Sequence, residues 1–130
     1  MNKFNSRLDI TIAKRVMGLA LTRSKNDYRY HLKISDKNIE HWRFNKGLDR
    51  FNVPRYSTNI NEAWLVVLKL IGKGLGFTMH RTGARNGLYG CIFGRADIKY
   101  DRDPARAICL AALECYECYK NDAMGYFKKP

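Results

Sequence analysis

The clearest pattern of apolar and polar positions lies in residues 59–76. Apolar side chains recur there at the i, i+3, i+4 and i+7 spacing of one helical face. These positions are Ile60, Ala63, Trp64, Val67, Leu68 and Ile71. Leu65, Val66 and Leu70 widen the apolar stripe, Asn59 is placed to cap the helix, and glycines follow its end. We expect this helix to lie in the middle of the fold, with other elements packed around it.

Two further helices are predicted, one toward each end of the chain. Asn5 or Ser6 can cap the first, which ends near Met17-Gly18. Asp103 can cap the last, and Pro104 suits its first turn. The last helix carries a stripe of small and apolar residues that suits close packing on a sheet: Ala105, Ile108, Cys109, Ala112, Leu113, Cys115 and Tyr116.

Period-two alternation predicts the strands. Residues 28–34 alternate and would place Arg29, His31 and Lys33 on one solvent-facing side. Residues 77–81 and 88–95 are predicted to pair as a hairpin, with the turn signal Asn86-Gly87 between them, and residues 96–100 add a third short strand. We therefore expect a single α+β domain over residues 1–130, with an antiparallel sheet sandwiched between about three α-helices.

A basic and aromatic connection occupies residues 35–55. Its apolar residues Trp42, Phe44, Leu48 and Phe51 are interleaved with the basic residues Arg43, Lys46, Arg50 and Arg55. Such a segment can stack nucleobases and hold phosphates. It can equally be a loop whose aromatic side chains fill the edge of the core, and the sequence leaves both interpretations open.

The charge balance points to an anionic partner. The chain has 24 Lys+Arg against 12 Asp+Glu, a formal net charge of +12. A field of that sign favours nucleic acid, nucleotides, other phosphates or an acidic protein surface. The alternative is a positive surface that only keeps the protein soluble. With no signal peptide and no apolar run long enough for a bilayer, we expect the protein in the host cytosol, away from membranes.

The side chains that could carry chemistry are sparse. Cys115 and Cys118 have a metal-like spacing, but no second close pair accompanies them, so we expect reduced thiols and neither a metal nor a cofactor. The carboxylates are scattered except for Asp97, Asp101 and Asp103, and Asp103 already serves as a helix cap. None of the hydrolase, zinc-protease or phosphate-loop motifs is present. A non-enzymatic protein is therefore expected.

Three stretches together resemble the phage ABA sandwich domain family: residues 12–18, 56–70 and 107–113. Tyr56-Ser-Thr before the central helix and Ala107-Ile-Cys in the last helix carry the resemblance in order. It implies a phage origin and an α-β-α layered fold, and it supplies no catalytic residue because most members have no assigned activity. The chain departs from the family in its basic, aromatic segment 23–55 and in Tyr100-Asp-Arg-Asp-Pro104.

These features together predict a phage-encoded binding protein. We expect it to sequester an anionic nucleotide, such as a host immune signalling molecule, and so to counter antiphage defence, acting as a homo-oligomer. One alternative is a nucleic-acid-binding protein or an anti-CRISPR-like nuclease inhibitor that acts on a host defence protein. Another is a small phosphodiester-cleaving enzyme with His80 as general base. The predicted ligand-binding residues are Trp42, Arg43, Arg50, Arg55, Tyr56, His80, Arg81, Arg85, Arg95 and Lys99.

Overall fold

The computed structural model describes residues 6–23, 30–33, 36–38, 52–83 and 87–127. The chain divides into two compact units, Met1–Arg55 and Tyr56–Pro130, and each is described by itself. The α+β class with antiparallel strands is confirmed, and the strands form one sheet of two strands and one of three. No helix in the described ranges is long and apolar enough to cross a membrane.

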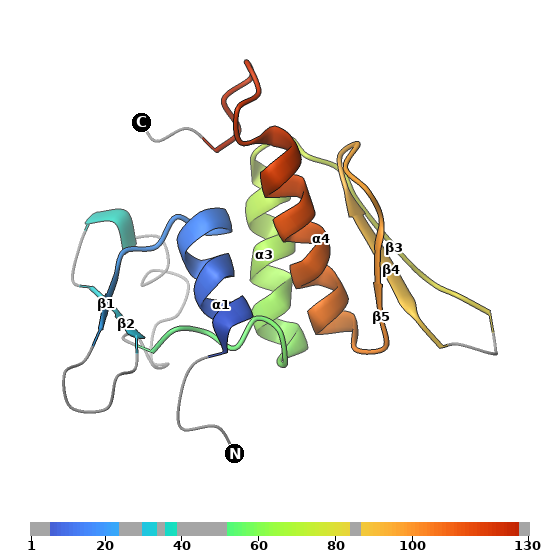
Figure 1. Ribbon diagram of the computed structural model, residues 1–130, viewed down its shortest axis with the longest axis horizontal. Coiled ribbons are helices and arrows are strands. Elements are labelled where there is room, and N and C mark those ends of the chain that lie inside the picture. Colours follow the sequence, from blue (N-terminus) through green and yellow to red (C-terminus); the bar gives the residue numbers. More distant parts are fainter. Residues whose placement is uncertain (1–5, 24–29, 34–35, 39–51, 84–86, 128–130) are drawn as a thin grey trace. The chain divides into compact units, whose positions relative to one another are not determined.

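In the first unit, helix α1 spans Arg7–Thr11 and continues as a π-helical turn over Ile12–Val16 (Figure 1). The hydroxyl of Ser6 accepts a hydrogen bond from the Asp9 backbone N–H at 3.1 Å, which confirms one of the two predicted caps. Gly18 follows with a φ of 67°, a left-handed conformation that glycine adopts without strain. The predicted end of this helix is confirmed.

The two-stranded sheet of the first unit pairs β1, Leu21–Arg23, with β2, Tyr30–Leu32. The strand predicted over residues 28–34 is confirmed at its centre, whereas β1 lies where the sequence pattern is weak and was not predicted. The fully buried Asn38 stabilises the hairpin, since its side chain accepts from the Ala20 N–H at 2.9 Å and donates to the carbonyls of Ala20 and Lys33. Of the predicted basic connection over residues 35–55, residues 35 and 39–51 lie outside the described ranges.

In the second unit, helix α3 spans Ile60–Gly72. The Asn59 side chain accepts hydrogen bonds from the backbone N–H groups of Asn61 at 3.0 Å and Glu62 at 3.2 Å, so the predicted cap is confirmed. Gly74, which follows the C-terminal cap Lys73, has a φ of 94° and terminates the helix. The glycines after residue 71 therefore terminate the helix, as helix C-terminal glycines commonly do.

The three-stranded sheet follows: β3, Phe77–Arg81; β4, Tyr89–Phe93; and β5, Lys99–Asp101. Their order is β3-β4-β5 and both pairings are antiparallel. The register aligns Met79 with Cys91 and Cys91 with Lys99. The predicted hairpin and third short strand are both confirmed.

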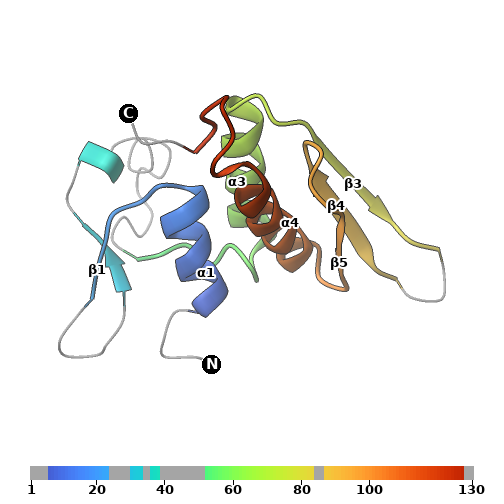
Figure 2. The same ribbon diagram turned by 45° about the horizontal axis from the view of Figure 1, so that its top comes forward.

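Helix α4, Pro104–Tyr119, lies between α3 and this sheet in both views (Figure 1, Figure 2). Its buried residues are Ala105, Ala107, Ile108, Cys109, Ala111, Ala112 and Cys115. The expectation that the helix at residues 60–71 occupies the middle is therefore wrong within this unit. The small side chains of α4 allow close approach on two sides, and α3 buries only part of its apolar surface.

We predict that enlarging one of these small side chains destabilises the second unit. Ala112 is fully buried, so Ala112→Leu should lower the free energy of unfolding by about 1–3 kcal/mol through overpacking. Urea unfolding followed by circular dichroism measures the change. Ala123→Leu, at an exposed position after the helix, is the matched control and should change stability little. Equal effects of the two substitutions would contradict the central role of α4.

Candidate functional site

The three-stranded sheet has one covered face and one open face. Alternation along the strands, combined with the register, directs Phe77, Met79, Cys91, Phe93 and Lys99 toward α4. Cys91 and Phe93 are fully buried, and α4 packs on β4 and β5. The opposite face, here called the open face, consists of Thr78, His80, Gly90, Ile92 and Tyr100. Within the described part of the second unit, no helix packs on it.

Two rings meet over a glycine in the centre of the open face. The rings of His80 on β3 and Tyr100 on β5 pack edge to face, with centroids 6.0 Å apart and an interplanar angle of 85°. Gly90 lies between them on β4. A Cβ atom at that position would stand 2.7 Å from Cε1 of His80 and 2.8 Å from Cε1 of Tyr100. Glycine is therefore required for this ring pair, and both rings are exposed to solvent.

Two arginines lie at one end of the same sheet. Arg81 is the last residue of β3 and pairs with Tyr89 at the start of β4, which in turn pairs with Asp101 at the end of β5. Alternation places the Arg81 side chain on the α4 side of the sheet, opposite the open face. Arg102 follows directly after β5, and both arginines are exposed. The Arg81 guanidinium lies 5.8 Å from the centre of the Tyr89 ring. Among the residues that the structure describes, neither arginine pairs with a carboxylate, so their charges remain available to an anion.

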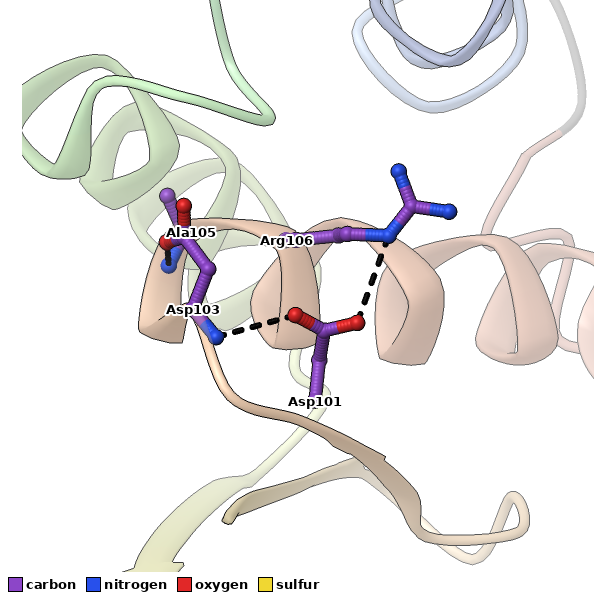
Figure 3. Close-up of polar contacts among 4 residues, drawn as sticks. All are labelled: Asp101, Asp103, Ala105 and Arg106. Atoms are coloured by element: carbon purple, nitrogen blue, oxygen red, sulfur yellow. Dashed lines mark hydrogen bonds and ion pairs between the residues drawn. The ribbon is translucent and has the colours of Figure 1, made fainter. Parts of the chain in front are cut away.

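The acidic residues near this end are engaged in the junction between β5 and α4 (Figure 3). Asp101 accepts a hydrogen bond from the Asp103 backbone N–H at 2.9 Å, and its other oxygen lies 3.3 Å from Nε of Arg106. Asp103 in turn accepts from the Ala105 N–H at 2.9 Å, which confirms its predicted role as a cap. These carboxylates fix the end of β5, the strand that carries Tyr100.

The structure separates the predicted ligand-binding residues that it describes in the second unit. His80 lies on the open face, whereas the adjacent Arg81 alternates to the α4 side of the sheet. Arg95 belongs to the turn after β4, near the Phe77 end of β3, which is four residues or about 13 Å along the strand from Arg81. Lys99 faces α4, with its Nζ 3.5 Å from a carboxylate oxygen of Glu114. Of these four residues, the sheet therefore places only His80 on the open face.

The other predicted residues have different surroundings. The Tyr56 side chain is fully buried, and Arg55 belongs to the first unit. Trp42, Arg43, Arg50 and Arg85 lie outside the described residues. Sequence reasoning missed Gly90, Tyr100 and Arg102, although the third strand was expected to end at Tyr100. What was lacking was the strand register, which places that ring opposite His80.

The cysteines are mostly buried thiols. Burial raises the pKa of Cys91 to about 11. Burial, and to a smaller extent the nearby Cys118, raise the pKa of Cys115 to about 12. Cys109 is also buried and Cys118 is exposed. No group of three or more side chains suited to a metal occurs among the described residues.

Comparison with known proteins gives the family. The sequence pattern of the phage ABA sandwich domain matches residues 10–113. The chain belongs to this family. The predicted resemblance is thereby confirmed, and a phage origin is supported.

The fold of this ABA sandwich protein is similar to the crystal structure of a phage protein from Bacillus cereus ATCC 14579. The TM-score is 0.53 at 22% sequence identity, over 82% of this chain and 86% of the other. At that identity the likeness concerns the fold alone. A search of curated proteins finds no significant match.

We predict that an aromatic disulfide, which reacts with thiols and releases a coloured thiolate, rapidly modifies one thiol per folded chain near neutral pH. That thiol is Cys118. The three buried thiols, two of which have raised pKa values, should react only after denaturation. The absorbance of the released thiolate gives the number of reactive thiols per chain, measured once in the folded protein and once in guanidinium. Cys118→Ser should remove the rapid phase, and a second rapid thiol in the folded protein would contradict the assignment.

Proposed function

We propose that this phage ABA sandwich protein binds an anionic nucleotide without transforming it, and that it withholds this nucleotide from a host defence response. The observation that supports the proposal best is the ring pair of His80 and Tyr100 over Gly90. It occupies a face that nothing in the described second unit covers. Arg102 stands at the end of that sheet, directly after β5, without a carboxylate partner among the described residues.

The ring pair suits a nucleobase. Stacking of a base on an aromatic side chain contributes about 1–3 kcal/mol. The imidazole and the phenol can also form hydrogen bonds to the edge of a base. The outer strands β3 and β5 lie two strand spacings apart, or about 10 Å, which is the width of one base rather than of several. We therefore place one base on the ring pair.

The phosphates of the bound nucleotide would lie toward Arg102, which directly follows β5. Guanidinium groups bind phosphate through paired, charge-assisted hydrogen bonds. The net charge of +12 adds a long-range attraction for anions. Asp101 is paired with Arg106, and Asp103 accepts a hydrogen bond from the Ala105 N–H, so both carboxylates are engaged within the junction between β5 and α4.

A binding role accords better with the open face than a hydrolytic role does. A general base needs a reacting group or a positioned water beside it, usually with an orienting partner. The residues that share the open face with His80 are Thr78, Gly90, Ile92 and Tyr100, and none is acidic. Sequestration requires only that the protein accumulate to a concentration above both that of the nucleotide and the Kd.

The second candidate is a protein that binds nucleic acid, directly or as a nuclease inhibitor. The charge supports it, because basic residues occur throughout the chain and a longer backbone would engage many of them. The same ring pair could stack a base of a single strand. Salt dependence separates the candidates. For an oligothymidylate of about 20 nucleotides, the logarithm of the association constant should fall with log[salt] with a slope of several units. ATP engages few charges, so its association constant should depend only weakly on salt.

The first test is to identify what the protein retains from infected cells. The purified protein, after a high-salt wash, is heated, and the released material is analysed by absorbance at 260 and 280 nm and by mass spectrometry. We expect a small phosphorylated nucleotide, recovered intact at about one per subunit or per dimer. A clean protein that also retains no nucleotide from an infected-cell lysate would refute sequestration.

Variants of the ring pair test the site. Tyr100→Ala should weaken binding of the recovered nucleotide about 10- to 100-fold, because one stacking partner is lost. Gly90→Ala should weaken it too, since the added Cβ displaces both rings. Isothermal titration measures the change, with circular dichroism as the check on folding.

Two control variants match these changes. Tyr126→Ala removes a ring in the C-terminal segment, where it contacts Tyr119, and should leave affinity unchanged. Arg102→Ala should weaken binding, whereas Arg7→Ala, the same change of charge on α1, should not. Equal losses for Arg102→Ala and Arg7→Ala would mean that only net charge matters, which is the behaviour expected of the nucleic-acid alternative.

A further inference from the structure

An exposed row of large apolar side chains runs along α3. Ile60 is 44% exposed, Trp64 44%, Leu68 53% and Ile71 49%. At 100° per residue these four positions fall within about 80° of one another around the helix axis. They form one continuous row beside the buried positions Ala63, Val66, Val67 and Leu70.

The row continues onto the edge strand β3. The Trp64 ring meets the Phe77 ring edge to face, with centroids 6.0 Å apart. Met79, two residues further along the same face of β3, is 39% exposed. We call Ile60, Trp64, Leu68, Ile71 and Met79 the α3 patch. At ~200 Å² for a large side chain, its exposed area is on the order of 400 Å², the size of patch that commonly marks an interaction site.

The α3 patch lacks charge although the protein is strongly basic. The exposed residues of α3 are Ile60, Asn61, Trp64, Leu68, Ile71 and Gly72, and none is charged. The two charged residues of the helix, Glu62 and Lys69, have opposite signs and lie on the other side of its axis from the row. Two chains with a net charge of +12 each can therefore approach here without placing like charges in contact.

The spacing of the row is also self-complementary. Its midpoint lies between Trp64 and Leu68, with Ile60 and Ile71 at nearly equal distances on either side. Two antiparallel copies related by a two-fold axis through that midpoint would place Trp64 against Leu68 of the partner subunit. Ile60 would then lie against Ile71 of the partner subunit. This is the isologous contact of a two-fold homodimer.

We infer that the α3 patch is the interface of a homodimer of this chain, with the two α3 helices antiparallel. The open face of the sheet takes no part in the contact, so the inference is independent of the proposed nucleotide binding. The patch is smaller than the ~800 Å² per partner of a standard stable interface. The dimer should therefore dissociate on dilution, with a Kd in the micromolar range.

Sedimentation of the full chain over a range of concentrations tests the dimer. We expect the mass to rise from 15.1 kDa toward twice that value with concentration. Trp64→Glu and Leu68→Lys should each weaken self-association about 100-fold or more, because a charge would be buried against an apolar partner. Met124→Glu, at a side chain that is 74% exposed outside the patch, is the matched control and should leave the dimer unchanged.

Mixing the two variants tests the antiparallel arrangement itself. In a mixed dimer, Glu at position 64 of one copy would face Lys at position 68 of the other, while the second Trp64–Leu68 contact remains apolar. Association should therefore be restored in the mixture and in neither variant alone. A parallel pairing would not restore it.

Three results would overturn the inference. They are a wild-type protein that stays monomeric at hundreds of micromolar, a dimer that persists in both folded variants, and a mixture that remains monomeric. Circular dichroism and urea unfolding of each variant establish that it is folded, since both substituted side chains are half exposed and do not fill the core.

Discussion

The packing of α4 between α3 and the three-stranded sheet is the interaction on which the second unit depends. The helix meets both neighbours through alanine and cysteine side chains, together with Ile108, all of them buried. Small side chains permit close approach on two sides, but they leave little tolerance for added volume. The positions of β4 and β5, and with them Gly90, Ile92 and Tyr100 on the open face, follow from this contact.

The same helix fixes the ends of the sheet through polar contacts. At its N-terminus, Asp101, Asp103 and Arg106 connect β5 to the first turn of α4. At the other end of α4, the Tyr119 hydroxyl accepts a hydrogen bond from the Arg95 N–H at 2.8 Å and so fixes the turn between β4 and β5. A sheet fixed at both ends presents a stable surface on its other face. These contacts hold the turn after β4 and the end of β5, the strands that carry Gly90 and Tyr100.

The second unit thus carries two exposed surfaces of different chemistry. The open face combines two rings with one nearby arginine, Arg102, that has no carboxylate partner among the described residues, and its chemistry suits a planar anion. The α3 patch is apolar and uncharged, and its chemistry suits a second apolar surface. On a protein with a net charge of +12 the two requirements conflict, because charge that attracts an anion repels another copy. The α3 patch itself contains no charged residue, and this allows both.

The sequence by itself determined the features that depend on near neighbours. The caps at Ser6, Asn59 and Asp103, the helix ends at glycine and the strands of the second unit were all predicted, because each rests on contacts within a few residues. The family was also evident from the sequence. The tertiary structure alone decided that α4 rather than α3 is central within the second unit, because burial depends on which helix can approach two neighbours closely. It also decided which residues share the open face: His80 was predicted from its type, but its proximity to Gly90 and Tyr100 follows from the register of strands ten and twenty residues away in the chain.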